Sequence, residues 1–256
     1  MNYGKAKKIL IFLFLFVNLV LISLLVGISG DNNELSLDSL NKVIALAKQK
    51  NISVEQSSLP KRVEMLDFLE LERLSDFKAQ IPEAIPVVSE KPADILKGLT
   101  KQDFLNDYSL EFSSKDTNLI TDEVKYQFTQ SYNGYTLYGS ELYAIVQKKS
   151  ITNVSGTLFN LKSVKYSDFE MISPLQILLD ISANYSGNGE KISSVKQAYY
   201  IPPDSLEFKN LTAIPCYVID LSKGKLFYDA VNGDFLMYLG INGNSIFDKT
   251  EAFSSI

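Results

Sequence analysis

The chain of 256 residues contains no histidine and a single cysteine, Cys216. Without histidine, the Ser-His-Asp and Cys-His catalytic arrangements, histidine metal ligands and the HExxH zinc motif are all excluded. The side chain that most often acts as a general base near neutral pH is therefore absent. One cysteine cannot form an intramolecular disulfide, so an exported chain would depend on its core for stability.

Basic residues are also scarce beyond the N-terminus. Lys5, Lys7 and Lys8 are the only charged residues before Asp31. Removing these three from the 25 lysines and arginines leaves 22 against 30 acidic residues, a net charge of −8. Nucleic-acid binding favours a basic surface, so this balance argues against a nucleic-acid partner.

Charge is absent from one long apolar segment, residues 9–28. A helix of about 20 residues spans about 30 Å, the thickness of the hydrocarbon core of a bilayer. The apolar core of a signal peptide is usually shorter, and Ile28-Ser29-Gly30 is a poor cleavage site because its outer position is bulky. We expect a retained transmembrane helix, with a cleaved signal peptide as the alternative.

The lysines predict the orientation of this helix. By the positive-inside rule, residues 1–8 form a cytoplasmic tail that carries Lys5, Lys7 and Lys8. Residues 29–36 form a polar linker, and residues 31–256 lie outside the cell membrane. The predicted protein thus crosses the lipid bilayer once.

Asn18 lies near the middle of the predicted span. An interhelical hydrogen bond from such a side chain contributes roughly 0.6 to 2 kcal/mol. A long apolar helix could simply tolerate this asparagine, or the stripe around it could dock on another transmembrane helix. At helical spacing the stripe comprises Ile11, Phe14, Asn18, Leu21, Ile22 and Leu25.

The first part of the predicted ectodomain, residues 37–98, has a mixed pattern. Leu37, Leu40, Ile44 and Ala47 recur at helical spacing and predict a helix that ends near Lys50. A short strand should follow before Pro60. Residues 62–74 suit a strand or a helix, and we favour a strand; prolines then mark a connection before a helical turn at 94–98.

The second part, residues 99–256, is dominated by strand patterns. From Glu123, apolar residues alternate with polar ones, and Asn133-Gly134 predicts a turn. Ser173-Pro174 predicts the start of a helix that runs to about Ala183. Further strands are expected at 140–147, 153–169, 192–201, 213–220, 224–230 and 234–240. Strands that alternate apolar and polar residues have one buried face and one face exposed to solvent. This pattern predicts antiparallel sheets, and together with the helices it predicts an α+β fold.

No candidate for catalysis or metal binding is convincing. Segments 229–235 and 242–251 lack the EF-hand spacing, and turn formation explains Asp229, Asn232, Asn242 and Asn244 better. Ser193 to Lys196 matches S-x-x-K, but that motif needs a helix and this segment is predicted to be a strand. Cys216 lies in an apolar strand, where a buried side chain is favoured over a reactive thiol.

Three stretches together resemble the YycI family: MNYGKAKKILIFLFLFVNLVLI at the N-terminus, VKYQFTQSYNGYTLYGSELYAIV in the centre, and ISSVKQAYYIPP followed by AIPCYVIDLSKGKLFYDAVNGDF. The last two also resemble PepSY-type propeptide modules. Family members tend to have tryptophan where Tyr3 and Tyr217 stand here. This departure leaves open a distant relative or a member of the longer sister family, YycH.

The resemblance implies a fold and a function. YycI proteins are single-pass, non-enzymatic accessories of an essential sensor histidine kinase of the YycG/WalK type in Gram-positive bacteria. With YycH they contact the kinase through transmembrane helices and tune its signalling to cell-wall metabolism. Their ectodomain has curved antiparallel sheets with helices packed on one face. The pattern carries over no catalytic residue, cofactor or metal ligand, and only Asn18 and its stripe match the anchor.

The propeptide-like pattern supports a second function. Such a module could act as an extracytoplasmic peptidase inhibitor, or bind peptides, through strand addition. Exchange of the first 30 residues for an unrelated anchor would separate the two functions. Kinase regulation should be lost, whereas peptidase inhibition should survive.

Overall fold

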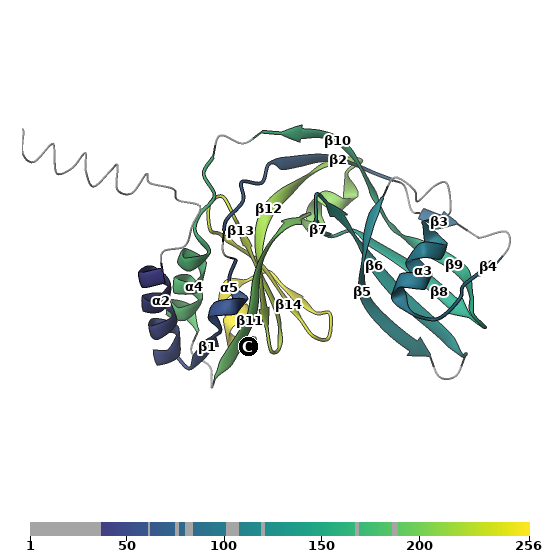
Figure 1. Ribbon diagram of the computed structural model, residues 1–256. Helices are drawn as coiled ribbons and strands as arrows, with labels where there is room; N and C mark the ends of the chain where they lie inside the picture. The colour runs from purple at the N-terminus through teal and green to yellow at the C-terminus, as the bar shows by residue number, and fades with distance from the viewer. Residues whose placement is uncertain are drawn as a thin grey trace, which may run out of the picture.

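The computed structural model describes residues 37–60, 62–74, 77–79, 84–100, 108–118, 121–166, 169–185 and 189–256 (Figure 1). The helices are α2 (Leu37–Gln49), α3 (Pro92–Leu99), α4 (Pro174–Asn184) and α5 (Lys249–Ser255), with short 3-10 helices η1 (Gln56–Ser58) and η3 (Pro203–Glu207). The strands are β1 (Ile52–Val54), β2 (Phe68–Arg73), β3 (Phe77–Ala79), β4 (Ile85–Pro86), β5 (Ser109–Asn118), β6 (Glu123–Tyr132), β7 (Tyr135–Tyr138), β8 (Glu141–Gln147), β9 (Ser150–Thr157), β10 (Phe159–Lys165), β11 (Glu190–Tyr200), β12 (Asn210–Leu221), β13 (Gly224–Asp229), β14 (Phe235–Gly240) and β15 (Ser245–Ile246). The predicted α+β class is confirmed.

The predicted membrane segment, residues 9–28, lies outside the described residues, as do residues 1–8 and 29–36. Among the helices that the structure describes, none is both long enough and apolar enough to cross a bilayer.

The strands join into one sheet in the order β15-β14-β13-β12-β11-β7-β6-β8-β9-β3, with β1, β2, β4, β5 and β10 attached beside this path. Most neighbours are antiparallel, but β1 and β7 both run parallel to β11. The expectation of a wholly antiparallel sheet is therefore wrong. Alternation within one strand does not encode the direction of its neighbour, and parallel pairing arises through long crossovers.

Two lobes joined by a bridge are visible in Figure 1. The large lobe comprises β1, β11–β15, α2, α4 and α5, and the small lobe comprises β3–β6, β8, β9 and α3. The bridge comprises β2, β7 and β10, in which β2 pairs with both β10 and β12, and β7 connects β6 to β11. Residues 37–98 contribute to all three parts.

Two helices cover the large lobe as the sequence predicted. Leu40 and Ala47 of α2 are buried, although Leu37, the first residue of the helix, is 65% exposed. The α4 helix begins where predicted, with Pro174 in its first turn. The Ser173 hydroxyl accepts a hydrogen bond from the Leu175 amide at 3.3 Å. Residues of both helices belong to the same apolar cluster as Tyr217 and Ile219 of β12, which places α2 and α4 on one face of the sheet.

The small lobe is organised by β6 and α3. Val124, Tyr126 and Phe128 are buried at alternate positions of β6, which confirms the predicted strand. They belong to the same apolar cluster as Ile95 and Leu99 of α3. The predicted helical turn at 94–98 is part of α3.

Several elements depart from the sequence analysis, among them β2, β5 and the unpredicted helix α5. The strand favoured within residues 62–74 is present but begins only at Phe68. The ten-residue strand β5 was not predicted, because its sequence SLEFSSKDTN is mostly polar and buries only Leu110. Long pairing with β6 determines its structure.

Candidate functional site

Among the described residues, one face of the sheet carries no α-helix in either lobe, and strand register carries this face from one lobe to the other. Residues opposite each other in register share a face, and successive residues alternate. Tyr200 of β11 lies opposite Tyr138 of β7, and Thr136 of β7 lies opposite Ser131 of β6. We call this surface the helix-free face; its residues include Ser194, Lys196, Tyr200, Asp220, Lys225, Phe227, Tyr138, Thr136, Ser131 and Glu111.

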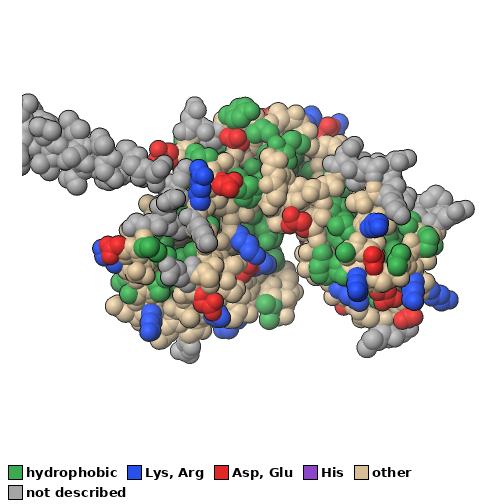
Figure 2. Space-filling model, viewed as in Figure 1, with side chains coloured by type: hydrophobic (Ala, Val, Ile, Leu, Met, Phe, Trp, Pro, Cys, Tyr) green, Lys and Arg blue, Asp and Glu red, His purple; other side chains and the backbone are tan. Residues whose placement is uncertain are grey.

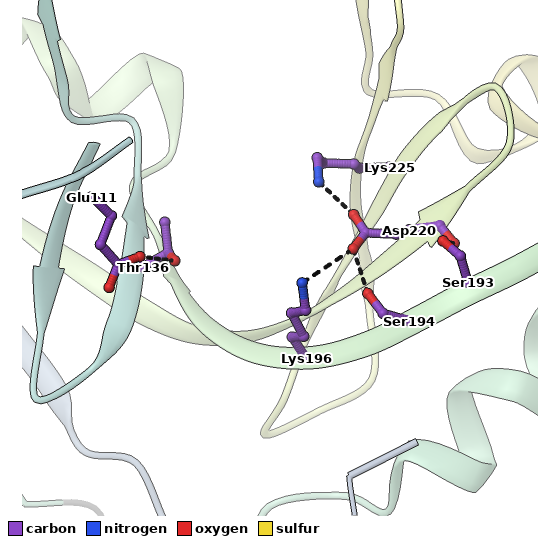
Figure 3. Close-up of polar contacts among 7 residues, drawn as sticks. All are labelled: Glu111, Thr136, Ser193, Ser194, Lys196, Asp220 and Lys225. Carbon is purple, nitrogen blue, oxygen red and sulfur yellow. Dashed lines mark hydrogen bonds and ion pairs between the residues drawn. The ribbon is translucent and has the colours of Figure 1, made fainter. Parts of the chain in front are cut away.

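Asp220 of β12 forms the centre of a charged row on the helix-free face (Figure 3). Ser194 of β11 and Lys225 of β13 lie opposite it on either side, and both hydrogen-bond its carboxylate. The Lys196 ammonium lies 3.6 Å from Asp220 Oδ2. Burial alone would raise the pKa of Asp220, but hydrogen bonds from Lys225 and Ser194 and the charges of both lysines hold that pKa below its usual value. The row therefore holds two positive charges and one negative charge.

The bridge contributes Tyr138, and β5 of the small lobe contributes a second carboxylate, Glu111. Tyr138 packs edge-on against Phe227, with ring centroids 4.9 Å apart. Burial raises the pKa of the Tyr138 hydroxyl, and the negative charges of Asp220 and Glu111 raise it further. The Thr136 hydroxyl donates a hydrogen bond to Glu111 Oε2 at 3.2 Å (Figure 3). Strand β7 therefore contacts Glu111 through Thr136 and Phe227 through Tyr138.

A cleft separates the lobes below the bridge (Figure 2). The helix-free face of β11–β13 forms its large-lobe wall, and β5 is the part of the small lobe nearest to that wall in Figure 1. The ammonium groups of Lys196 and Lys225 can attract an anionic group, while Ser194 is engaged by Asp220. This chemistry favours binding over catalysis.

A cavity of about 320 Å³ lies at the bridge. Leu69, Leu71 and Leu161 contribute to its apolar lining. Its polar groups are engaged within the protein: the Tyr108 hydroxyl donates to Asn160 Oδ1 at 2.6 Å, and the Gln130 amide donates to and accepts from the Phe159 backbone. None of the described residues that line this cavity is charged, unlike Lys196 and Lys225 in the cleft.

The two nucleophiles considered in the sequence are placed as predicted. Cys216 is fully buried in β12, and burial together with the charge of Asp229 raises the pKa of its thiol. Ser193 and Lys196 lie in β11, so the S-x-x-K match is in a strand. The Ser193 hydroxyl donates to the Asp220 carbonyl at 3.1 Å.

The glycine-rich acidic segments form turns. Asp229 Oδ1 accepts a hydrogen bond from the Val231 amide at 2.7 Å, and Asn232 Oδ1 accepts one from the Asp234 amide at 2.8 Å. Such Asx contacts stabilise tight turns. Within the part of the chain that the structure describes, no group of three or more cysteine, aspartate or glutamate side chains is arranged to hold a metal ion.

The residues predicted to form the membrane site lie outside the described residues. These are the topology lysines Lys5, Lys7 and Lys8, and the proposed interface residues Ile11, Phe14, Asn18, Leu21, Ile22 and Leu25. The charged row was missed in the sequence because its members come from three strands. The available signal was a polar residue at alternate positions in otherwise apolar strands, such as Asp220 after Val218 and Cys216.

Comparison with known proteins gives one family. The family model described as YycI protein matches residues 30–225, which include α2 to β12 and the first residues of β13. No curated protein matches the chain. The match covers most of the chain and confirms the resemblance seen in its sequence; the chain belongs to the YycI family.

Proposed function

We propose that this protein is a membrane-anchored, non-enzymatic accessory that modulates a sensor histidine kinase of a two-component system. Membership of the YycI family carries this proposal, because it indicates a regulatory accessory role in a histidine kinase system. The finer assignment includes transmembrane and extracytoplasmic contacts with the kinase, a YycH-like partner and a link to cell-wall metabolism. It also places residues 31–256 outside the membrane.

The proposed mechanism begins with the anchor. Residues 9–28 confine the protein to the membrane, where a second helix is met at high effective concentration. Packing of the Asn18 stripe and a hydrogen bond from its amide would favour one arrangement of the kinase helices. The ectodomain would change that preference when it binds a ligand with different affinity for the two arrangements.

The chemistry of the ectodomain supports a role without catalysis. The chain has no histidine, Cys216 is buried, and Asp220 is held by two lysines. These groups favour recognition, and a bound partner or ligand at the cleft is the simplest source of a signal.

An exchange of the anchor tests the proposal. Residues 1–30 would be replaced by an unrelated single-pass helix that keeps the same topology, and kinase output would be measured with a reporter gene in whole cells. We expect regulation to be lost while the protein stays in the membrane fraction. Regulation that is unchanged after the exchange would contradict transmembrane contact as the mechanism.

The single substitution Asn18→Leu refines this test. It keeps an apolar helix of the same length and removes the interhelical hydrogen bond. We expect weaker recovery of the kinase with the solubilised protein, whereas Ser23→Leu, in the same span but outside the stripe, should have no effect. The rival peptidase-inhibitor function predicts that neither substitution matters and that inhibition survives the anchor exchange.

A further inference from the structure

Strand β5 has a free edge. It pairs with β6 along its length, from Ser109 opposite Ser131 to Asn118 opposite Glu123, and no other described strand pairs with it. Apart from Leu110, its residues are exposed. Natural sheets protect such edges with bulges and lysines. Here the edge is protected by one irregularity after Phe112 and by the charges of Glu111, Lys115 and Asp116. No proline interrupts the ten residues, so the edge can accept another strand.

The opposite wall of the cleft supplies positive charge. The Lys196 side chain is 69% exposed, whereas the Asp220 side chain that it approaches is only 19% exposed. Asp220 is already neutralised by Lys225, so Lys196 has charge to offer to a ligand. Residues 31–256 carry a net charge of −8, so the net positive charge of the row formed by Lys196, Lys225 and Asp220 is a local exception. This positive charge favours an acidic partner.

We propose that the cleft binds an extended acidic segment of a partner protein, which adds to the free edge of β5 and places a carboxylate against Lys196. Main-chain hydrogen bonds to β5 would supply sequence-independent affinity, and Lys196 and Lys225 would supply selectivity. Glu111 repels a second carboxylate near the bridge, so charge also fixes the position of the acidic residue. The proposed regulation takes its signal from this cleft, but peptide binding itself does not require the transmembrane helix, so the two proposals can fail separately.

Selection from a displayed library of random twelve-residue peptides tests the site. The full-length chain in lipid nanodiscs would serve as the target. We expect the enriched peptides to carry aspartate or glutamate within β-favouring sequences. When such a peptide is bound, amide hydrogen exchange should slow in β5 and leave the β14–β15 edge unchanged.

Two matched charge reversals on β11 complete the test. Lys196→Glu should lower the affinity for the selected peptide about tenfold, as expected for loss of one charge-assisted contact. Lys191→Glu is the control, because Lys191 is an exposed lysine of the same strand whose partner is Glu55 at 2.7 Å. Both variants keep the Lys225–Asp220 pair and should remain folded, which thermal unfolding would verify.

Three outcomes would overturn the proposal. The first is a selection that enriches no peptide above one performed on empty nanodiscs, or only peptides without acidic residues. The second is an acidic peptide whose affinity falls equally in the two variants. The third is binding without slower exchange in β5, which would place the peptide on another surface.

Discussion

The two lobes cover the same sheet in different ways. In the large lobe, α2, α4 and α5 enclose a cluster of 23 buried apolar residues. In the described part of the small lobe, the eight-residue helix α3 covers a cluster of 13. Because stabilisation grows with buried apolar area, the small lobe should open first. It is also the lobe that carries the free edge of β5, so the proposed binding edge belongs to the less stable half.

The largest expected effect comes from creating a cavity of equal size in the core of each lobe by a leucine-to-alanine substitution. Leu226 of the large lobe and Leu142 of the small lobe are both fully buried strand residues. Each substitution to alanine should cost about 2–5 kcal/mol of unfolding free energy. Leu142→Ala should speed amide exchange in both lobes, because it lowers the free energy of small-lobe opening and of global unfolding, whereas Leu226→Ala should speed exchange in the large lobe only. Hydrogen exchange with mass spectrometry would measure this, and the reverse pattern would refute the proposed order of stability.

The charged row should give the next largest effect. Asp220→Asn removes the negative charge that compensates Lys196 and Lys225, and we expect a loss of about 1–3 kcal/mol at pH 7. Because the pKa of folded Asp220 is below its ordinary value, the stabilisation is present at neutral pH. It is lost as pH falls from about 5 through the folded pKa.

Urea unfolding at pH 7 and pH 3 would check this prediction. The difference between wild type and Asp220→Asn should shrink at the lower pH. Glu55→Gln, in an exposed ion pair with Lys191, should leave stability unchanged at both values. A difference that is equal at both pH values would show that the charge of Asp220 does not stabilise the fold.

A smaller effect is expected at the start of α4. Ser173→Ala removes the side chain that caps this helix and should cost about 1 kcal/mol. Ser173→Asp retains an acceptor and should restore most of the loss. Thermal unfolding would measure both variants, and equal destabilisation by the two would mean that the cap contributes nothing.

The smallest effect concerns the start of α3 in the small lobe, which lacks the side-chain cap that α4 has in the large lobe. Lys91 occupies the N-cap position and makes no side-chain capping bond. Lys91→Ser should therefore stabilise the small lobe by about 0.5–1 kcal/mol. Slower amide exchange in α3 would show the gain, and faster exchange would contradict it.

Periodicity within one segment predicted α2, β6 and α4, because each buries one face regardless of its partner. Leu40 and Ala47, Tyr126 and Phe128, and the Ser173-Pro174 start all act locally. The parallel pairing of β7 with β11 was not predictable, because Leu137 and Tyr199 are 62 residues apart in the chain and meet only in the tertiary fold.

The candidate site shows the same limit. Asp220 lies opposite Ser194 and Lys225 only when three strands are in register, and a shift of one residue would place it among the buried residues on the other face. Strand β5 was missed for a related reason, since pairing with β6 and not its own apolar pattern holds it in the sheet.

The most direct test of the proposed regulation is photocrosslinking from position 18 in intact membranes. A photoreactive residue would replace Asn18, and the captured protein would be identified by mass spectrometry, with position 23 as the matched control. We predict that the histidine kinase, or its YycH-like companion, is captured from position 18 and not from position 23. Capture of neither protein, or a mature chain that begins near Gly30 and is found outside the membrane, would contradict the proposed function.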